Sequence, residues 1–503
     1  MASIKKNIAA NIIGRFWSAA IVILLTPIYI KYLGIEAYGL IGFYATLIGS
    51  MFILDLGLSI TLNRELATFK SQNKSSKDVR NLTFSLECIY WLIGIVLSLL
   101  VIILSGFIAT NWVNAEHLST GTVKNAVMLM GIIVAFQWPI SLYSGGLTGL
   151  EKQVLGNIIM VTMTTIRAAG VLVVIIFFSK SVLSFFLWQA VTTCMYVLIM
   201  RLALWKALPK GTGKARFSKT QIVVIWRFAA GMTGIGLVTF FLTQIDKIML
   251  SKILPLSQFG YYTLAFSLAS SLSLLSSPIS IAYFPRFAEF FAARRNEELK
   301  TAYHNASKLI TVLLCPFCFF LLFFMRDILI IWTKDALTTD QVCLLAQLLV
   351  SGYMFNAFMI IPYQLLIATG WTKFALIQNT IAALLMVPLL VWLTYKYGAK
   401  GAASVWLIIN TGYVFISQPL IHRRLLQGEL QSWYIKDTLF PMLPSFICLL
   451  SIKYLVYYFL PEVHLNLFFL GSFFLLAMVV SAINLPRRKN LLDSIYVRMY
   501  KHD

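Results

Sequence analysis

The 503-residue chain has few charged residues, and its acidic residues are fewer than its basic ones. Asp, Glu, Lys and Arg make up 12% of the residues, whereas 59% are hydrophobic. Soluble domains are about one quarter charged, so this composition excludes an ordinary soluble fold and predicts an integral membrane protein. The 41 basic and 19 acidic residues give a formal net charge of +22. In a membrane protein such an excess is expected in loops on one side of the bilayer, so we expect no nucleic-acid partner.

Reactive side chains are also few. The six cysteines and five histidines are scattered, and the CPFC motif at 315–318 lies inside an apolar run. No metal-ligand cluster is present in the sequence, and we read the CPFC cysteines as small apolar residues. No GxxxxGK[ST] motif occurs, so intrinsic ATP hydrolysis is not expected. No polar stretch is long enough for a catalytic domain. The sequence therefore predicts neither an enzyme nor a cofactor or metal site.

Long apolar runs account for most of the chain. A helix needs about 20 apolar residues to cross a bilayer, and the runs are continuous rather than alternating, which excludes a barrel. The sequence therefore predicts an all-α integral membrane protein with about fourteen transmembrane helices. Their expected ranges are about 11–30, 38–61, 83–108, 124–147, 156–178, 182–204, 222–250, 258–283, 308–325, 340–367, 374–394, 402–421, 439–459 and 464–484.

The distribution of Lys and Arg predicts the orientation of these helices. With the N-terminus in the cytoplasm, the inner segments hold about three times as many basic residues as the outer ones. The densest are the segments at 62–82, 201–220, 286–308 and 485–503. We therefore expect a multi-pass membrane protein with both termini cytoplasmic.

An internal repeat divides the chain. At a shift of 221 residues, GLSITLNRELA (57–67) aligns with PISIAYFPRFA (278–288), and TGLEK (148–152) aligns with TGWTK (369–373). Tyr38-Gly39 falls on Phe259-Gly260 at the same shift. Six crossings return the chain to the same side, so the repeat predicts two parallel six-helix bundles, an arrangement used by transporters.

The repeat also predicts the domain boundaries. The first bundle, helices 1–6, is expected at 1–204, and a basic cytoplasmic linker at 205–221. The second bundle, helices 7–12, is expected at 222–421. Residues 422–503 hold two extra helices and a basic tail.

Three arginines lie within the predicted helices of the repeat. Asn11, Arg15 and Ser18 are spaced to lie on one face of the first helix, and Arg227 has the corresponding place in the seventh. Arg15 and Arg227 either reach the interface or line a polar cavity; both readings stay open. Arg167 lies near the middle of its helix, where a charge is costly, so it requires a hydrated or paired site. We assign Arg15, Arg167 and Arg227 to binding an anion, and Asn11 and Ser18 to the cavity lining.

Acidic candidates are fewer. Asp55, Ser59 and Asn63 form a polar face at i+4 steps and are expected to line the same cavity. Asp55 either pairs with an arginine or takes part in ion coupling. Glu87, near the start of the third helix, is expected at the interface and is the second candidate for ion coupling.

Three further charged residues, Asp246, Lys247 and Lys453, are not assigned to the site. Asp246 and Lys247 are adjacent, so their side chains should point apart near the outer end of the seventh helix. Lys453 lies outside the repeat, and the sequence names no partner for it.

The opening of the chain resembles a known family. TPIYIKYLGIEAYGLIGF (26–43) followed by LDLGLSITLNRELA (54–67) is similar to the start of bacterial polysaccharide (O-antigen repeat-unit) flippases. These belong to the multidrug/oligosaccharidyl-lipid/polysaccharide exporter superfamily. The resemblance implies that the substrate is an oligosaccharide on a polyprenyl diphosphate, moved from the inner to the outer leaflet by alternating access. It also implies membrane lipid and the polysaccharide polymerase and chain-length machinery as partners.

Alternatives within and outside this superfamily stay open. A small-molecule or multidrug cation antiporter would need carboxylates in its cavity, whereas the repeat helices carry arginines. Flippases of lipid-linked peptidoglycan precursors also have fourteen helices. A membrane-embedded glycan polymerase or ligase would need a long outer loop with catalytic groups, and the longest outer loop, near 109–123, holds one Glu and one His.

Overall fold

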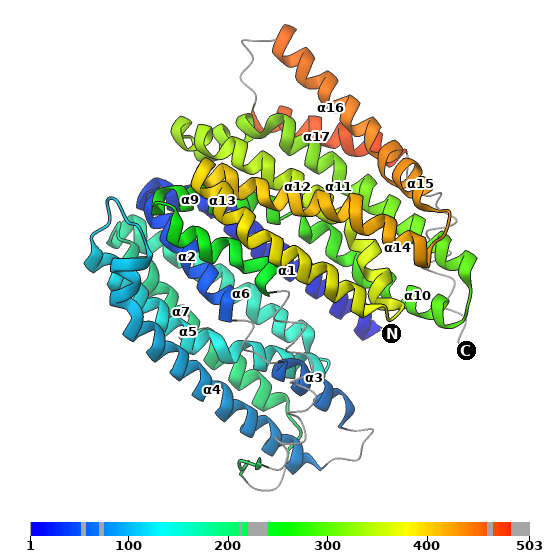
Figure 1. The fold of residues 1–503 in the computed structure, drawn as a ribbon. Helices are drawn as coiled ribbons and strands as arrows, with labels where there is room; N and C mark the ends of the chain where they lie inside the picture. Colours follow the sequence, from blue (N-terminus) through cyan, green and yellow to red (C-terminus); the bar gives the residue numbers. More distant parts are fainter. Residues whose placement is uncertain are drawn as a thin grey trace. The chain divides into compact units, whose positions relative to one another are not determined.

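The computed structural model describes residues 2–51, 57–69, 75–210, 214–219, 240–459 and 466–483. These residues are almost entirely helical and contain no β-strand, only an isolated bridge between Asn114 and Pro255. The chain divides into two compact units, 1–263 and 264–503. The predicted all-α membrane fold is therefore confirmed (Figure 1).

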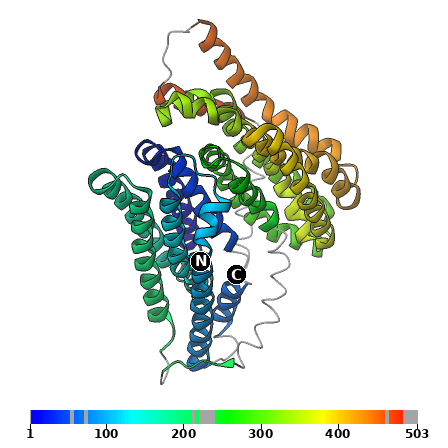
Figure 2. The ribbon, with the colours of Figure 1, turned by 60° about the vertical axis from the view of Figure 1, so that its left-hand side comes forward.

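The first unit is built mainly from long helices that run alongside one another (Figures 1 and 2). Residues 240–253 are also helical and belong to this unit. Its named elements are α1 (Ala2–Leu33), α2 (Ile35–Met51), α3 (Leu58–Thr68), α4 (Ser76–Phe107), η2 (Ile108–Trp112), α5 (Thr120–Gly149), α6 (Gln153–Val173), η3 (Val174–Phe178) and α7 (Val182–Ala207), where η marks a short π-helix.

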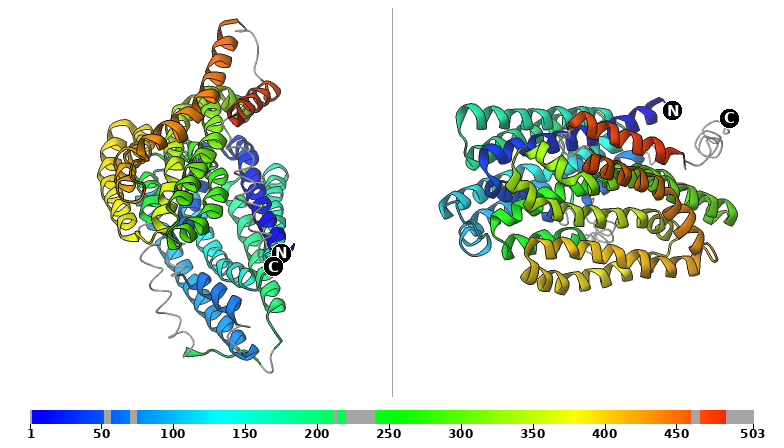
Figure 3. Two further views of the ribbon diagram at one scale, coloured as in Figure 1. Left: turned by 90° about the vertical axis from the view of Figure 1, so that its right-hand side faces the viewer. Right: turned by 90° about the horizontal axis from the view of Figure 1, so that it is seen from above.

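The second unit begins within α9 (Leu256–Ser270), which crosses the boundary. In it, α16 and α17 pack against each other and against α11 (Figure 3). Its other elements are α10 (Ser273–Ala292), α11 (Asn296–Thr333), α12 (Ala336–Ala368), α13 (Thr372–Gly412), η4 (Tyr413–Ser417), α14 (Gln418–Leu425), α15 (Leu430–Ser432), η5 (Trp433–Leu439), α16 (Phe440–Phe459) and α17 (Leu467–Ala482).

In the described part of the chain, nine helices are long and apolar enough to cross a membrane, or ten if the bent pair α9–α10 counts as one span. The count of fourteen stays a prediction. One reason is that two predicted spans, 374–394 and 402–421, lie in a single helical stretch, Thr372–Leu425. A change of direction is marked only by Gly398, whose φ of 59° breaks the helix internally.

Helix α4 illustrates how these sequences form membrane helices. Leu92, Val96, Leu99 and Ile103 form an exposed stripe with helical spacing, as expected for a face in contact with lipid. The opposite face is buried and contains Gly94, where an added Cβ would lie 3.1 Å from a carbonyl oxygen of α5. Small residues at this contact let the two helix backbones approach closely, which is how membrane helices gain packing energy.

The repeat is visible in one close backbone contact. A Cβ on Gly39 of α2 would lie 2.2 Å from the carbonyl oxygen of Leu256, and one on Gly260 of α9 would lie 2.5 Å from that of Ile35. Gly39 and Gly260 are equivalent positions of the repeat. Both lie in the first unit, so equivalent glycines from the two halves of the sequence share one tight contact.

Candidate functional site

The predicted polar face of α1 is used in different ways along its length. Asn11 donates to Oε1 of Gln153 over 2.9 Å and accepts from Nδ2 of Asn157 over 2.5 Å. These bonds join α1 to α6. Arg15, one turn further on, is exposed and makes no hydrogen bond or ion pair with the described residues. The Ser18 hydroxyl is buried and has no hydrogen-bond partner among the described residues.

The second predicted polar face, on α3, packs against α5. A Cβ added to Gly145 of α5 would lie 2.6 Å from the carbonyl oxygen of Ser59, and a Cβ added to Gly149 would lie 2.4 Å from the carbonyl oxygen of Asn63. Ser59 and Asn63 are half-buried. The close contact of α3 with α5 therefore depends on backbone atoms of these two residues. Two other predicted site residues, Asp55 and Arg227, lie outside the described residues.

Arg167 is the arginine deepest in a predicted span. It lies on α6 within the apolar stretch Gln153–Phe178, roughly 15–20 Å from either end at about 1.5 Å per residue. Its Nη2 donates to the hydroxyl of Thr193 on α7 over 3.2 Å, and its Nε is buried without a partner among the described residues. No described carboxylate pairs with it. A guanidinium with unused donors and no counter-charge can receive an anion.

Three aromatic side chains lie near Arg167, and one of them, Trp188, contacts its backbone. The indole N–H of Trp188 donates to the Arg167 carbonyl over 3.0 Å. An added Cβ on Gly170 would lie 2.1 Å from the Trp188 ring, so the glycine is required for the ring to lie against α6. Tyr44 of α2 and Tyr196 of α7 lie within electrostatic reach of the guanidinium. The site thus combines one fixed cation with hydroxyl and aromatic groups.

Glu87 of α4 is buried, with 3% of its surface exposed, and does not lie at an exposed interfacial position as the sequence suggested. Arg201 of α7 donates to it from Nε over 2.5 Å, Tyr143 from its hydroxyl over 2.6 Å, and Trp205 from its indole over 3.1 Å. Sequence reasoning missed Arg201 because it lies at the inner end of a predicted span and was counted as a loop charge. Its pairing occupies the Glu87 carboxylate with three donors.

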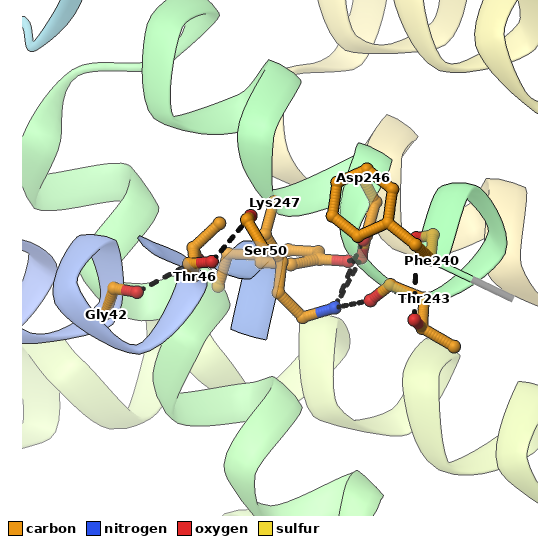
Figure 4. A network of polar contacts seen from close by, with 8 residues as sticks. Gly42, Thr46, Ser50, Phe240, Thr243, Asp246 and Lys247 are labelled. Atoms are coloured by element: carbon orange, nitrogen blue, oxygen red, sulfur yellow. Dashed lines mark hydrogen bonds and ion pairs between the residues drawn. The ribbon is translucent and has the colours of Figure 1, made fainter. Parts of the chain in front are cut away.

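Asp246 and Lys247 form a buried pair, which contradicts the expectation that they point apart. Lys247 Nζ lies 3.1 Å from Asp246 Oδ1 and donates to the Thr243 carbonyl over 2.6 Å (Figure 4). Tyr262 donates to the other Asp246 oxygen over 2.9 Å. Their side chains are 9% and 12% exposed. Neighbouring Cβ atoms diverge on a helix, but the flexible lysine stem folds back because a buried charge without a partner costs several kcal/mol.

The polar residues of α2 near this pair satisfy themselves. Thr46 and Ser50 donate to carbonyl oxygens one turn earlier on their own helix, over 3.0 and 2.7 Å (Figure 4). Both charges of the Asp246–Lys247 pair are therefore compensated locally, and the pair adds no net charge to the first unit.

The second unit also pairs its membrane-depth lysine. Lys453 on α16 contacts Asp327 on α11 over 3.1 Å, a partner that the sequence did not name. Among the described residues, no group of three His, Cys, Asp or Glu could hold a metal ion. Arg15 and Arg167 therefore remain as the described cations of the predicted site that have no carboxylate partner.

The chain matches two protein-family models and is similar to a named transporter. The family model described as "Polysaccharide biosynthesis protein" matches residues 4–291, and the MatE family model matches residues 234–392. The chain is 24% identical over 413 residues to the Shigella flexneri protein named "Putative O-antigen transporter". That alignment covers 81% of this chain and 94% of the relative.

Solved structures of low sequence identity share the fold. One is the "Lipid II flippase MurJ, inward closed conformation", with a TM-score of 0.69, 15% identity, and coverage of 98% of this chain and 99% of that one. Another is described as an "Inward-facing conformation of a multidrug resistance MATE family transporter of the MOP superfamily". Its TM-score is 0.66 at 12% identity, covering 82% of this chain and 96% of that one.

Proposed function

The chain belongs to the polysaccharide biosynthesis protein family and has a transporter fold of the MOP superfamily, and from this we propose that it is a flippase for a polyprenyl-diphosphate-linked oligosaccharide. The glycan is a repeat unit of O-antigen or another surface polysaccharide. It moves from the inner to the outer leaflet of the bacterial plasma membrane by alternating access, with both termini of the protein in the cytoplasm. The family and its relatives are transporters, not enzymes.

The observation that supports this substrate best is the state of Arg167. A guanidinium deep in an apolar span costs about 2.5–3.5 kcal/mol on insertion scales. Pairing with a carboxylate would offset this cost, yet no described carboxylate lies against it. A transported diphosphate supplies the missing negative charge, and the guanidinium fork matches phosphate oxygens. Arg15 on α1 is a second cation without a partner among the described residues, and Arg227 is proposed as the third.

The same pattern argues against a cation antiporter. Such a protein needs an accessible carboxylate in its cavity. The carboxylates of Glu87 and Asp246, both buried in the described first unit, are each already paired with a basic side chain. Asp55 remains a proposed site residue for ion coupling.

The membrane potential can drive the proposed transport. With about two negative charges on the substrate, a potential of 100 mV, negative inside, favours outward movement by roughly 4–5 kcal/mol.

Complementation in a deletion strain tests the proposal. Cells without the gene should accumulate lipid-linked repeat units in the inner leaflet, and the wild-type chain should restore surface glycan. We expect Arg167→Gln to abolish export at normal protein levels, because a charge-assisted contact of about 1.5–3 kcal/mol is lost. Arg167→Lys keeps the charge without the fork and should export partially.

The matched control is Arg326→Gln, which neutralises an arginine that is exposed and paired with Asp340. It should export like the wild type. Normal surface glycan in the Arg167→Gln strain would refute the assigned role. Accumulation of peptidoglycan precursors instead of repeat units would assign the chain to the other class of lipid-linked flippase.

A further inference from the structure

The second unit carries a group of uncharged polar and aromatic side chains within its candidate spans. Along α12, residues 353, 356, 360, 363, 364 and 367 are all half-buried and fall on one helical face at 100° per residue. Two polar members of this face, Asn356 and Gln364, are joined by hydrogen bonds to α13 and α10. We define the amide face as the polar and aromatic residues of this α12 face together with three residues of α13 and η4; its members are Tyr353, Asn356, Tyr363, Gln364, Asn379, Trp406 and Tyr413.

Side-chain amides and hydroxyls hold the amide face together. Asn356 donates to Asn410 over 2.8 Å, and Gln364 donates to Ser280 over 3.0 Å. The Tyr413 hydroxyl donates to Oδ1 of Asn379 over 3.1 Å. These bonds involve α10, α12, α13 and η4 of the second unit and fix the orientation of the amide groups.

Each of these amides keeps one group unused. Within the described residues, no bond is made by Nδ2 of Asn379, Oε1 of Gln364 or Oδ1 of Asn356, and the Tyr363 hydroxyl is also free. These four groups offer both donors and acceptors, and none is charged. Half-buried polar groups in an apolar span are costly unless something hydrogen-bonds to them.

Aromatic rings flank the unused groups. Tyr353 and Trp406 lie with their ring centroids 5.4 Å apart, and Trp406 packs against Gly352, where a Cβ would lie 2.6 Å from the indole. Tyr413 adds a third ring. Planar rings next to fixed amides can contact the apolar face of a sugar ring while the amides bind its hydroxyls.

We propose that the amide face is the glycan-binding subsite of the flippase, an inference that rests on the proposed function. Sugar hydroxyls need neutral partners that both donate and accept, which the amide face supplies. A diphosphate needs donors and positive charge, and none of the residues of the amide face is basic. The glycan is therefore recognised by different residues from those proposed to hold the diphosphate.

The test compares two lipid probes on the purified full-length chain in detergent, with binding followed by native mass spectrometry. One probe is polyprenyl diphosphate without sugar, and the other is the lipid-linked repeat unit extracted from cells lacking the gene. Tyr363→Phe removes a hydroxyl that has no partner among the described residues, so the fold should be kept. It is expected to weaken binding of the repeat-unit lipid by roughly threefold to tenfold.

A double variant, Tyr363→Phe with Asn379→Ala, should weaken binding of that lipid more than tenfold while changing binding of polyprenyl diphosphate less than twofold. The matched control is Tyr395→Phe, the same change at an exposed tyrosine. It should bind both probes like the wild type.

Equal losses for both lipids, or no loss for the repeat-unit lipid, would overturn the glycan subsite. The proposed function has a separate failure, in which the wild-type chain itself binds neither lipid. Arg167→Gln provides the complementary pattern, because it should weaken binding of both probes.

Discussion

The ion pair between buried Glu87 and partly exposed Arg201 predicts unequal effects on stability when either partner is replaced. The Glu87 side chain is 5% exposed, whereas the Arg201 side chain is 44% exposed. Removing the arginine leaves a carboxylate in the protein interior, whereas neutralising the glutamate leaves an arginine that can turn toward the exterior. Replacing the two partners should therefore have different effects.

The contacts allow a rough magnitude for each change. Glu87→Gln keeps the shape of the side chain and an oxygen for Tyr143 or Trp205, so it should cost about 1–2 kcal/mol. Arg201→Leu leaves the carboxylate with two neutral donors. Breaking a fully buried pair in this direction costs about 3–5 kcal/mol, and the exposure of Arg201 reduces this to about 2–4 kcal/mol.

Thermal unfolding of the detergent-purified variants, followed by size-exclusion fluorescence, measures this ranking. We expect the midpoint to fall further for Arg201→Leu than for Glu87→Gln, and the double variant to be no less stable than Arg201→Leu alone. A Glu87→Gln variant that is the less stable of the two would refute this reasoning. The same variant should still export glycan; a folded variant without export would support the ion-coupling role of Glu87.

Three further substitutions test other contacts. Asp335→Ala removes the N-cap of α12 and should cost about 1 kcal/mol in thermal unfolding. A threonine hydroxyl of the first turn lowers the Asp335 pKa, so this difference should be full at neutral pH and disappear as the pH falls through the lowered pKa. Gly39→Leu would force apart α2 and a carbonyl of α9 and should prevent accumulation of folded protein, whereas Gly471→Leu, where nothing lies within 4 Å, should not. Lys247→Met leaves a buried carboxylate and should lower the unfolding midpoint by the equivalent of about 3–5 kcal/mol, most of it recovered by adding Asp246→Asn.

The helical membrane fold could be predicted because it depends on local composition. The run predicted at 83–108 corresponds to α4, Ser76–Phe107, and the structure extends it by several residues at the polar end. The number of spans was harder to predict, because apolar runs do not show where a helix bends or continues. Gly398, between Lys396 and Lys400, breaks one helical stretch in the gap between the spans predicted at 374–394 and 402–421, although no long loop separates them.

The pairing of charges could not be predicted, because it depends on contacts between distant segments. Glu87 and Arg201 are 114 residues apart in sequence and meet only when α4 and α7 pack on α5. The Cβ atoms of Asp246 and Lys247 do diverge on their helix, as the sequence predicts. The prediction that the side chains point apart is nevertheless wrong, because the long lysine side chain reaches back to the carboxylate in an apolar environment.

Two equivalent glycines of the repeat share a close backbone contact, but the two halves differ in their charged residues, and this difference matches the proposed substrate with its two unlike parts. Gly39 and Gly260 are equivalent and make equivalent close contacts. At the same shift of 221 residues, however, Arg167 falls on Pro388, so the second half has no arginine where the first has its deepest one. A symmetric ligand would favour the same side chains in both halves. The charged diphosphate and the neutral glycan of the proposed substrate instead favour cations in one group of residues and amides in another.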